Sequence, residues 1–455
     1  MIALVVGFGG KSGVAAVNFL LEKGYFVRAN DIKKAEELTS WIDKVNKEKV
    51  EFVFGSHNIS ALDDVDMVVI SPGVPSNIEL IKEAKRREIP VLSEVELAYM
   101  EYPYNWICIT GTDGKSTTTS LIGNILKEAG KKVIVAGNIG VALTEKLLNL
   151  KEKDYYIVAE LSSFQLENIR KLKPYISLLL NVAEDHLDRY NNMEEYAEAK
   201  FNIFKNQSED DYAIINSDSH YINLYLNKDK IRAKKYYFSR QKEISPGTFY
   251  KDKKFIFVNS KGKKEVILKD ENIKLLGKHN RENILAAITT GKILNIKNSI
   301  IKKAIEDFTP LEHRTELVAV INNRKFINDS KATTISSVNM SLSAFDEPII
   351  AILGGRDKGL DFSLLNETLN NKVKYLILIG EAREKIKNMI NYPEDKIYET
   401  DDMEDAVNFA YKISKEGDII ILAPGCTSYD MYKNFEERGK HFKELVLKLK
   451  DKIEV

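Results

Sequence analysis

The segment from Ile107 to Thr119, which reads ICITGTDGKSTTT, restricts the fold of this chain more than any other segment. An apolar, β-prone run leads into a loop bracketed by Gly111 and Gly114, and an amphipathic helix begins at Lys115. A strand, a glycine loop and a helix N-terminus together form an anion site, because backbone N–H groups and the helix dipole point toward a bound phosphate. The segment therefore predicts an α/β domain that binds a nucleotide, in preference to an ordinary strand-to-helix turn.

The spacing of this loop differs from that of the usual P-loop. Ile109 stands where the usual motif has its first glycine, so the loop has the shortened form G-x-x-G-K-S. Lys115 still supplies a charge for a phosphate, and Ser116 supplies a hydroxyl group for Mg²⁺. Taken alone, the loop predicts nucleotide binding and leaves the reaction open.

Length and composition exclude several classes of protein. A chain of 455 residues is too long for one hydrophobic core, and 44% apolar and 29% charged residues are typical of a globular protein. The 67 lysines and arginines balance the 67 aspartates and glutamates, so no overall field favours nucleic acid or an anionic membrane. No apolar run approaches the roughly 20 residues that span a bilayer, and no signal peptide is recognisable. We therefore expect a cytoplasmic protein with no nucleic-acid partner and no membrane insertion.

Strand-like and helix-like runs alternate along the chain, which predicts an α/β fold of three domains, each with a mostly parallel sheet flanked by helices. We expect a Rossmann-like N-terminal domain at 1–102, a central P-loop-type ATPase domain at 103–310 and a Rossmann-like C-terminal domain at 311–455. A lysine-rich stretch from Lys234 to Lys274 predicts an antiparallel excursion from the central sheet. Apolar runs predict strands at Ile2–Val6, Phe26–Ala29, Met67–Ile70, Val133–Ala136, Tyr155–Ala159, Ser177–Leu180, Tyr212–Ile215, Lys325–Ile327, Ile349–Leu353, Tyr375–Ile379 and Asp418–Leu422.

A second glycine loop follows the first strand, where residues 7–13 read GFGGKSG. It departs from the dinucleotide-binding pattern G-x-G-x-x-G, because Ser12 stands where the third glycine belongs. A phosphate site and a tight strand-to-helix turn need the same glycines, so the loop alone does not decide between them. Asp31, at the end of the second strand, favours contact with a nucleotide ribose or base.

Four further residues could act at the phosphate site, each with a simpler alternative. Glu160 ends an apolar strand, where a carboxylate is well placed to bind Mg²⁺, and we favour this role over a solvated strand end. His186 lies among carboxylates and could bind a metal or orient a substrate, although an isolated histidine is usually structural. On pattern alone Lys200 is an exposed helical lysine, and a plain turn explains Asn138 almost as well as a functional amide does.

Together and in order, these motifs resemble the Mur ligases of peptidoglycan synthesis, and within that family the members that add D-glutamate. The shortened phosphate loop is shared with folylpolyglutamate synthases, whereas Asp329-Ser330-Lys331-Ala332-Thr333 resembles only the D-glutamate-adding branch. The resemblance covers essentially the whole chain. Its other motifs are residues 7–13, 71–73, 111–117, 137–140, 160–167, 185–190, 277–280 with Asn283, 313–314 and 433–439.

The resemblance implies an ATP-dependent ligase that adds D-glutamate to UDP-N-acetylmuramoyl-L-alanine through an acyl-phosphate and a tetrahedral intermediate. It implies two Mg²⁺ sites, ATP as co-substrate, N6-carboxylation of Lys200, and a monomer whose partners are small molecules. The catalytic residues that it implies are Lys115, His186 and Lys200. The implied metal ligands are Ser116, Glu160, His186 and the carbamate of Lys200.

The resemblance also assigns binding residues. Those for ATP are Gly111, Thr112, Asp113, Gly114, Lys115, Ser116, Thr117, Asn283, Arg314 and Asp329. Those for the UDP-linked substrate are Lys11, Ser12, Asp31, Ile32, Lys33, Ser71, Gly73, Asn138 and His186. Those for D-glutamate are Lys331, Thr333, Lys358, Ser428, Tyr429 and Phe435, a set rich in the cations and hydroxyl groups that a dicarboxylate requires.

Three positions depart from the family pattern, and three alternative functions compete with it. The first loop has an extra glycine, Lys33 stands where an arginine is common, and Tyr429 replaces a leucine near the amino-acid pocket. A nicotinamide dehydrogenase would leave the phosphate loop and Glu160 without a role. A non-catalytic nucleotide switch would release no phosphate in response to both substrates, and a folylpolyglutamate synthase lacks the Asp329–Thr333 motif.

Overall fold

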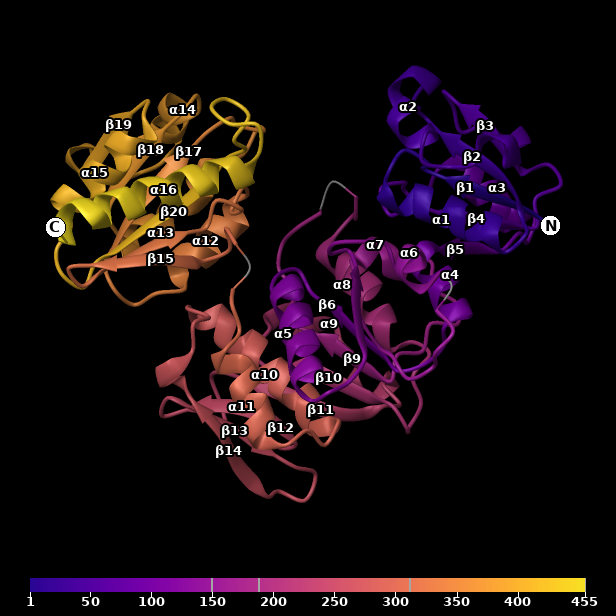
Figure 1. The fold of residues 1–455 in the computed structure, drawn as a ribbon, viewed down its shortest axis with the longest axis horizontal. Coiled ribbons are helices and arrows are strands. Elements are labelled where there is room, and N and C mark those ends of the chain that lie inside the picture. Colours follow the sequence, from indigo (N-terminus) through magenta and orange to yellow (C-terminus); the bar gives the residue numbers. More distant parts are fainter. Residues whose placement is uncertain (149, 187–188, 311, 455) are drawn as a thin grey trace. The chain divides into compact units, whose positions relative to one another are not determined.

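Three β-sheets organise the chain, which confirms the predicted α/β fold (Figure 1). The computed structural model describes residues 1–148, 150–186, 189–310 and 312–454. The chain divides into two compact units: one holds Met1–Asp270 with Glu282–Ile305, and the other holds Glu271–Arg281 with the chain from Glu306 onward. The boundaries expected after residues 102 and 310 stay predictions, and residue 311 lies outside the described residues.

The first sheet has five parallel strands, in the order β3 (Val50–Phe54), β2 (Phe26–Asp31), β1 (Ile2–Val6), β4 (Met67–Ile70) and β5 (Val91–Ser93). β1 and β4 are almost entirely buried, as expected for the centre of a parallel sheet. The sequence does not predict β3, which is mostly part-exposed and carries a glutamate, or β5, which has only three residues. The helices that accompany the first sheet are α1 (Lys11–Glu22), α2 (Ala35–Ile42), α3 (Glu79–Arg86) and α4 (Glu94–Glu101).

The second sheet has nine strands, in the order β14 (Lys264–Lys269), β13 (Lys254–Val258), β12 (Gly247–Lys251), β11 (Lys234–Ser239), β10 (Tyr212–Asn216), β9 (Ile176–Leu179), β6 (Trp106–Thr110), β8 (Tyr156–Glu160) and β7 (Val133–Gly137). Its helices are α5 (Lys115–Glu128), α6 (Leu143–Leu147), α7 (Ser163–Glu167), α8 (Met193–Phe201), α9 (His220–Tyr225), α10 (Lys278–Ile293) and α11 (Asn298–Glu306). The phosphate loop follows β6, which has parallel neighbours on both sides. Groups at the carboxyl ends of β8, β6 and β9 therefore meet at one edge.

The expected antiparallel excursion at 234–274 is corrected in part. β11 pairs parallel with β10, and β12 pairs parallel with β11, so these strands continue the main sheet. Only the pairs β12–β13 and β13–β14 are antiparallel, and they extend the same sheet instead of leaving it. The sequence suggested a separate hairpin because its lysines mark an exposed surface, and exposure does not distinguish a sheet edge from an excursion.

The third sheet has six strands, in the order β15 (Glu316–Ile321), β16 (Arg324–Asn328), β20 (Ile419–Gly425), β17 (Ile349–Gly354), β18 (Val373–Ile379) and β19 (Ile397–Thr400). All pairs are parallel except β15–β16, which form a hairpin. Its helices are α12 (Ile335–Ser343), α13 (Asn366–Lys372), α14 (Arg383–Met389), α15 (Met403–Ile413) and α16 (Phe435–Glu454). The apolar centre strands bury side chains on both faces, so each face has its own core.

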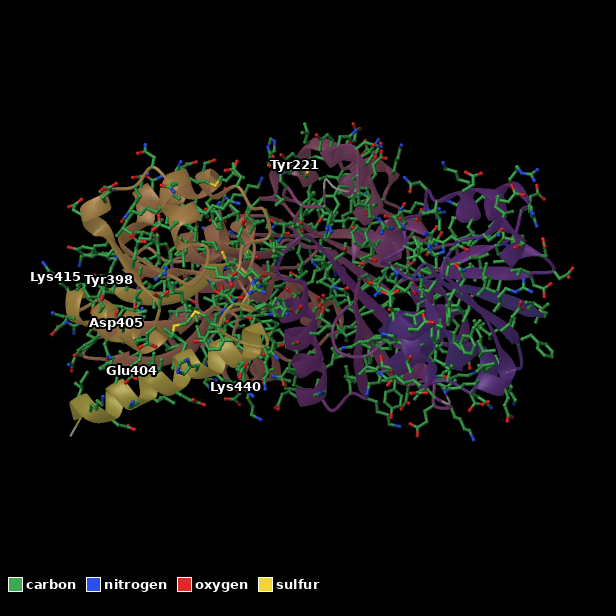
Figure 2. All side chains as sticks on the ribbon, turned by 90° about the horizontal axis from the view of Figure 1, so that it is seen from above. Tyr221, Tyr398, Glu404, Asp405, Lys415 and Lys440 are labelled. Carbon is green, nitrogen blue, oxygen red and sulfur yellow. The ribbon has the colours of Figure 1, made fainter. Side chains whose placement is uncertain are left out.

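Helices α15 and α16 cover one face of the third sheet (Figure 1). Phe442 and Val446 of α16 are fully buried in the core of this face, where α16 contacts β15 and β16. Tyr398 of β19 donates a hydrogen bond to Asp405 of α15 (2.8 Å), and its ring stacks on Phe409, which holds α15 against the edge strand (Figure 2). Of the helices in the described residues, none is both long enough and apolar enough to cross a membrane.

Two buried glutamates at the start of α4 join the first sheet to elements of the second. Glu96 accepts hydrogen bonds from the backbone N–H groups of three successive residues, 170–172, at 2.5–3.1 Å. Glu94 accepts from the backbone and the hydroxyl group of Thr144 at 2.6 and 2.7 Å. Burial raises the pKa of Glu94 above its ordinary value, against the effect of these bonds. The carboxylates thus fix α4 by several charge-assisted bonds.

Candidate functional site

The phosphate loop turns from β6 into α5 through Gly114, which has a φ of +80°. A Cβ atom at this position would lie 2.3 Å from Oδ1 of Asn283, so the loop needs glycine both for its conformation and for the close contact. Thr118 of α5 donates a hydrogen bond to the same Oδ1 atom (3.1 Å). Asn283, which the sequence assigns to ATP, therefore lies directly against the loop.

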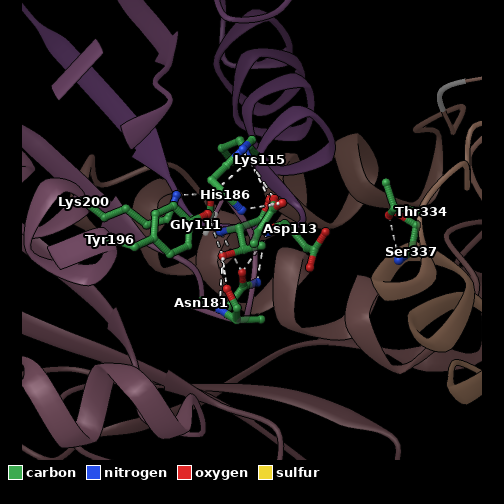
Figure 3. Close-up of polar contacts among 12 residues, drawn as sticks. Gly111, Asp113, Lys115, Asn181, His186, Tyr196, Lys200, Thr334 and Ser337 are labelled. Carbon is green, nitrogen blue, oxygen red and sulfur yellow. Dashed lines mark hydrogen bonds and ion pairs between the residues drawn. The ribbon is translucent and has the colours of Figure 1, made fainter. Parts of the chain in front are cut away.

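Two lysines bind one carbonyl oxygen of the loop. Lys115 and Lys200 donate to the carbonyl oxygen of Gly111 at 2.9 and 3.0 Å, and Lys115 also donates to that of Thr112 at 2.6 Å (Figure 3). The ammonium group of Lys200 lies 4.4 Å from the ring centre of Tyr196, and only 2% of the residue is exposed. The prediction of an exposed lysine, which the sequence pattern alone favours, is therefore wrong, because tertiary packing buries the face of α8 that carries Lys200.

Burial has a chemical consequence for Lys200. It lowers the pKa of Lys200 well below the ordinary value, and the nearby charge of Lys115 lowers it further. The carboxylates of Asp185 and Asp113 act in the opposite direction but are the smaller causes. The environment thus favours a neutral amine, which is the form that reacts as a nucleophile.

One buried carboxylate oxygen of Glu160, near the loop, accepts no hydrogen bond from the described residues, and we call it the unfilled oxygen. Glu160 ends β8 and pairs in register with Ile109 of β6, and it is 2% exposed. Its Oε1 atom accepts a hydrogen bond from the amide of Asn138 (3.0 Å), whereas its buried Oε2 atom has no partner among the described residues. Ser116 is also buried, in the first turn of α5. A buried acceptor without a donor and a hydroxyl group suit an oxygen-binding cation such as Mg²⁺.

His186 is held between aromatic rings and a carboxylate. Its ring centre lies 4.8 Å from that of Phe164 and 5.9 Å from that of Tyr196, and its Nε2 atom lies 3.4 Å from Asp185. Its φ of +54° is uncommon for a histidine. Leu187 and Asp188 of the same motif lie outside the described residues. Tyr196 contacts both His186 and Lys200, so the two predicted catalytic residues lie near one another.

No cluster of three or more His, Cys, Asp or Glu side chains suited to a metal ion occurs in the described part of the chain. The predicted ligand set of Ser116, Glu160, His186 and carboxylated Lys200 is of mixed chemical type. Such a set is not a cluster of His, Cys, Asp and Glu alone, so the metal site stays a prediction, and the observation that supports it is the unfilled oxygen of Glu160.

A cavity of about 680 Å³ opens at the carboxyl ends of β1, β2 and β4. Eight of the nine residues that the sequence assigns to the UDP-linked substrate line it, namely Lys11, Ser12, Asp31, Ile32, Lys33, Ser71, Gly73 and Asn138. His186 is not among its lining residues. Asn138 lines the cavity and also donates a hydrogen bond to Glu160, so one amide group belongs both to the cavity and to the surroundings of the phosphate loop.

The register of the first glycine loop follows from two contacts. A Cβ atom on Gly13 would lie 2.5 Å from the carbonyl oxygen of Gly7, so Gly13 is the residue that allows α1 to pack closely on the loop. Asp31 accepts hydrogen bonds from the backbone N–H groups of Gly9 (2.7 Å) and Lys33 (3.0 Å). Asp31 thus shapes the loop as well as lining the cavity.

In the second unit, the residues assigned to D-glutamate gather at the carboxyl ends of three adjacent strands. Lys331 and Thr333 follow β16, Lys358 follows β17, Ser428 and Tyr429 follow β20, and Phe435 begins α16. The ammonium group of Lys331 lies 4.5 Å from the ring centre of Phe435. Of the nucleotide candidates in this unit, Arg314 is half-buried and Asp329 is buried.

Comparison with known proteins identifies the family. The chain matches the Mur ligase MurD-like N-terminal domain over residues 2–93, the Mur ligase middle domain over 109–291 and the Mur ligase glutamate ligase domain over 313–426. It is 41% identical over 450 residues to the UDP-N-acetylmuramoylalanine–D-glutamate ligase of Thermoanaerobacter pseudethanolicus, and 41% identical over 452 residues to that of Alkaliphilus oremlandii, with 98% of each chain covered in both pairs. The chain belongs to the Mur ligase family.

The fold of this Mur ligase is shared beyond its near relatives. A solved pseudomurein peptide ligase type C from Methanothermus fervidus superposes with a TM-score of 0.58, covering 99% of this chain and 100% of the other. The two sequences are only 18% identical, so this likeness concerns the fold alone.

Asn181 of this Mur ligase holds the phosphate loop, and the sequence gives it no role. Its Oδ1 atom accepts the backbone N–H groups of Thr112 (3.0 Å) and Asp113 (2.8 Å), and its amide donates back to the carbonyl oxygen of Asp113 (3.1 Å; Figure 3). A sequence signal exists, because Asn181 directly follows the run that forms β9, next to β6. Polar residues after neighbouring parallel strands meet at one edge.

Arg189 and Glu167 form a second unassigned link. Arg189 donates to the carbonyl oxygen of Pro72 (2.8 Å) in the cavity wall and to the carboxylate of Glu167 (2.9 Å). Ser76 donates to the same carboxylate (2.6 Å). The wall of the cavity is thereby tied to the segment that carries His186.

Asp329 of this Mur ligase is a buried carboxyl group with a raised pKa. It accepts hydrogen bonds from the hydroxyl groups of Ser341 and Thr315. Burial raises the pKa of Asp329 to about 6, although both hydrogen bonds and the charge of Arg314 act in the opposite direction.

We expect Asp329→Asn to alter the pH dependence of stability. The folded protein keeps this proton up to about pH 6, whereas the unfolded chain loses it at about pH 4, so the wild type loses stability as the pH rises through this window. The loss is at most about 3 kcal/mol, and the variant lacks it. Urea unfolding at pH 4.5 and 7.5 should therefore show a relative gain in the unfolding free energy of Asp329→Asn at the higher pH. Asp401→Asn, at an exposed position, is the control, and parallel profiles for all three proteins would contradict the expectation.

Proposed function

We propose that this Mur ligase joins D-glutamate to UDP-N-acetylmuramoyl-L-alanine, with conversion of ATP to ADP and phosphate, in the synthesis of peptidoglycan precursors. The observation that carries the reaction type is the pair of lysines on one carbonyl oxygen of the phosphate loop, beside the unfilled oxygen of Glu160. The names of the two relatives, each 41% identical over 98% of the chain, support the choice of substrates.

The first step is the activation of a carboxylate. One carboxylate oxygen of the L-alanyl group attacks the γ-phosphorus atom of ATP, the bond to the bridging oxygen of ADP breaks, and an acyl-phosphate forms. Two anions must approach each other, so the site has to gather positive charge. Lys115 supplies this charge at the β- and γ-phosphates. Ser116 and Glu160 would hold Mg²⁺, which supplies further charge neutralisation when bound.

The second step forms the amide. The neutral amine of D-glutamate attacks the acyl carbon, a tetrahedral intermediate forms, and it collapses with release of phosphate and loss of a proton from nitrogen. His186 and the N6-carboxylate of Lys200 would hold a second Mg²⁺. The neutral amine of Lys200 reacts with CO₂ and loses a proton, which gives an N6-carboxylate, an oxygen ligand in place of an ammonium group.

In this proposal each substrate has its own set of binding residues. The cavity at the first sheet holds the UDP-linked substrate, with His186 near its reacting end. Asn283 contacts adenine together with the loop 111–117, and Arg314 and Asp329 contact the nucleotide. D-Glutamate is bound by Lys331, Thr333, Lys358, Ser428, Tyr429 and Phe435.

The domains that carry these sites are 1–102, 103–310 and 311–455 in this proposal. The enzyme acts as a monomer in the cytoplasm, where ATP and nucleotide-linked sugars are available. Light scattering of the purified chain measures its mass and tests the monomer directly.

We expect phosphate release only when ATP, Mg²⁺, UDP-N-acetylmuramoyl-L-alanine and D-glutamate are all present. The reaction is measured with D-glutamate, L-glutamate, D-lysine and L-lysine in parallel, and mixtures that lack the muramoyl nucleotide are the control. Because a dicarboxylate needs the cations listed for the amino-acid site, both lysine isomers should react at least about 100-fold more slowly than D-glutamate. Equal rates with lysine, or release without the muramoyl nucleotide, would contradict the proposal.

A further inference from the structure

Arg438, in the first turns of α16, is a fully buried cation whose partners are all neutral. It is 1% exposed. Its Nε and Nη2 atoms donate to the hydroxyl group (3.0 Å) and the carbonyl oxygen (2.9 Å) of Ser330, Nη2 also donates to the carbonyl oxygen of Cys426 (3.1 Å), and Nη1 donates to that of Thr427 (3.2 Å). No ion pair joins it to a carboxylate elsewhere in the described residues.

A buried charge without a carboxylate in direct contact is costly, so its position requires an explanation. The carboxylate of Asp430 acts on Arg438 electrostatically, but no ion pair joins the two. Burial lowers the pKa of Arg438 to about 10, and the guanidinium therefore remains protonated at neutral pH. In a medium of low dielectric constant such a charge acts over a longer distance than it would in water. The guanidinium therefore contributes positive charge at the surrounding loops, which favours an anionic ligand, and the carboxylate of Asp430 offsets part of this charge.

The hydrogen bonds of Arg438 reach the backbone of loops that follow two strands, and a third loop is joined to them. Ser330 follows β16, and Cys426 and Thr427 follow β20. The backbone of Thr427 exchanges two hydrogen bonds with Arg356, after β17, at 2.9 and 3.0 Å. Gly355, with a φ of +130°, leaves space for this arrangement, because a Cβ atom there would lie 2.2 Å from the carbonyl oxygen of Thr427 and 3.0 Å from Nη1 of Arg438.

These three loops carry five of the six residues proposed for D-glutamate, namely Lys331, Thr333, Lys358, Ser428 and Tyr429. The sixth, Phe435, lies one turn before Arg438 on the same helix, and its carbonyl oxygen accepts a hydrogen bond from the hydroxyl group of Ser330 (2.8 Å). One guanidinium group thus binds two of the loops that carry this set, and the third loop is bound through Thr427.

We propose that Arg438 is the positioning residue of the amino-acid site: it fixes the three loops relative to one another and contributes a positive charge close to them for a dicarboxylate substrate. The choice of substrate rests on the proposed function, whereas the fixing of the loops does not. Lysine cannot replace it fully, because an ammonium group has three donors around one point and lacks the planar fork that reaches three carbonyl oxygens.

Arg324, at the start of β16, provides a control in the same unit. It also donates to neutral oxygens, at the hydroxyl group (2.8 Å) and carbonyl oxygen (3.2 Å) of Ser414 and the carbonyl oxygen of Asn322 (2.8 Å). It lies at the opposite end of β16, away from the three loops. A variant at Arg324 therefore removes a similar set of bonds without touching the proposed amino-acid site.

The first experiment measures KM for D-glutamate, ATP and UDP-N-acetylmuramoyl-L-alanine in the full chain and in three variants, Arg438→Met, Arg438→Lys and Arg324→Met. We expect Arg438→Met to raise KM for D-glutamate about tenfold or more, and Arg438→Lys about threefold or more, with the other two KM values within about twofold. Arg324→Met should leave all three KM values within about twofold of wild type. An unchanged KM for D-glutamate in Arg438→Met, full recovery in Arg438→Lys, or the same increase in Arg324→Met would overturn the proposal.

The second experiment needs no substrate and separates this inference from the proposed function. Hydrogen–deuterium exchange of the ligand-free proteins should be faster at residues 330–333 and 426–428 in both Arg438 variants than in wild type and Arg324→Met. Unchanged exchange in both variants would overturn the positioning role. If wild type showed no response to D-glutamate while exchange changed as expected, the proposed substrate would be wrong and the positioning role would stand. Should Arg438→Met fail to fold, Arg438→Lys carries both measurements.

Discussion

Phosphate release by the Lys200→Ala variant is expected to fall by about 10³-fold or more, because the variant removes both a buried amine and the oxygen ligand that its carboxylation would supply. Burial and the nearby charge of Lys115 lower the pKa of Lys200 and so favour the neutral amine that reacts with CO₂, and the hydrogen bond to Gly111 places this group at the phosphate loop. Adding a short carboxylic acid to the variant should restore part of the activity, since a small carboxylate can occupy the place of the missing oxygens.

Lys292→Ala is the control for this prediction. Lys292 is also a largely buried lysine of the first unit, but it pairs with Glu265 (2.7 Å) and lines a different cavity. Its removal should leave phosphate release within about twofold of wild type, as is usual for a change away from the site. Near-normal activity of Lys200→Ala, or equal losses in both variants, would contradict the proposed role of Lys200.

Lys115→Met should show the second large effect, a loss of about 10³-fold in kcat/KM for ATP, because a charge at the transferred phosphoryl group is replaced by an apolar side chain of similar length. Without ligand, Lys115 donates to two carbonyl oxygens of its own loop. The variant should therefore fold, although its loop is less constrained. Steady-state phosphate release measures kcat/KM, and isothermal titration with ATP measures binding separately.

Lys127→Met is the matched control for Lys115→Met, because Lys127 lies in the last turn of the same helix, α5, and is exposed. We expect it to change kcat/KM for ATP by less than about twofold. A similar decrease in both variants would show that the loss arises from the helix as a whole, and the phosphate contact proposed for Lys115 would then be wrong.

The sequence predicts those parts of the fold and site that depend on neighbouring residues. The phosphate loop, Glu160 at its strand end and the central strands follow from local apolar runs and glycines, and the structure confirms these elements. The eight cavity residues come from four distant segments of the sequence, and only the family resemblance groups them. Their common cavity arises because parallel strands place their carboxyl ends at one edge.

The remainder depends on packing between distant segments. Nothing around Lys200 in the sequence distinguishes it from an exposed helical lysine, because its burial comes from the phosphate loop 89 residues away. Most partners of Asn181 and Arg438 are backbone groups, so the residue types of those partners carry little signal, although the position of Asn181 after a strand does. The edge strand β19 has only four residues and β3 carries a glutamate, so both escape a search for apolar runs. β15 contains an unbroken apolar run at 317–321, which the interpretation of the sequence missed.

The amide of Asn138 lines the cavity at the first sheet and binds the carboxylate of Glu160. A ligand that competes for this amide changes the number of free lone pairs on Glu160, and therefore the affinity of that carboxylate for a cation. Thermodynamic reciprocity then requires the cation to change the affinity of the cavity for its ligand by the same factor. If the proposed function holds, the affinities for the sugar nucleotide and for the metal are therefore linked, and one side chain is enough to couple them.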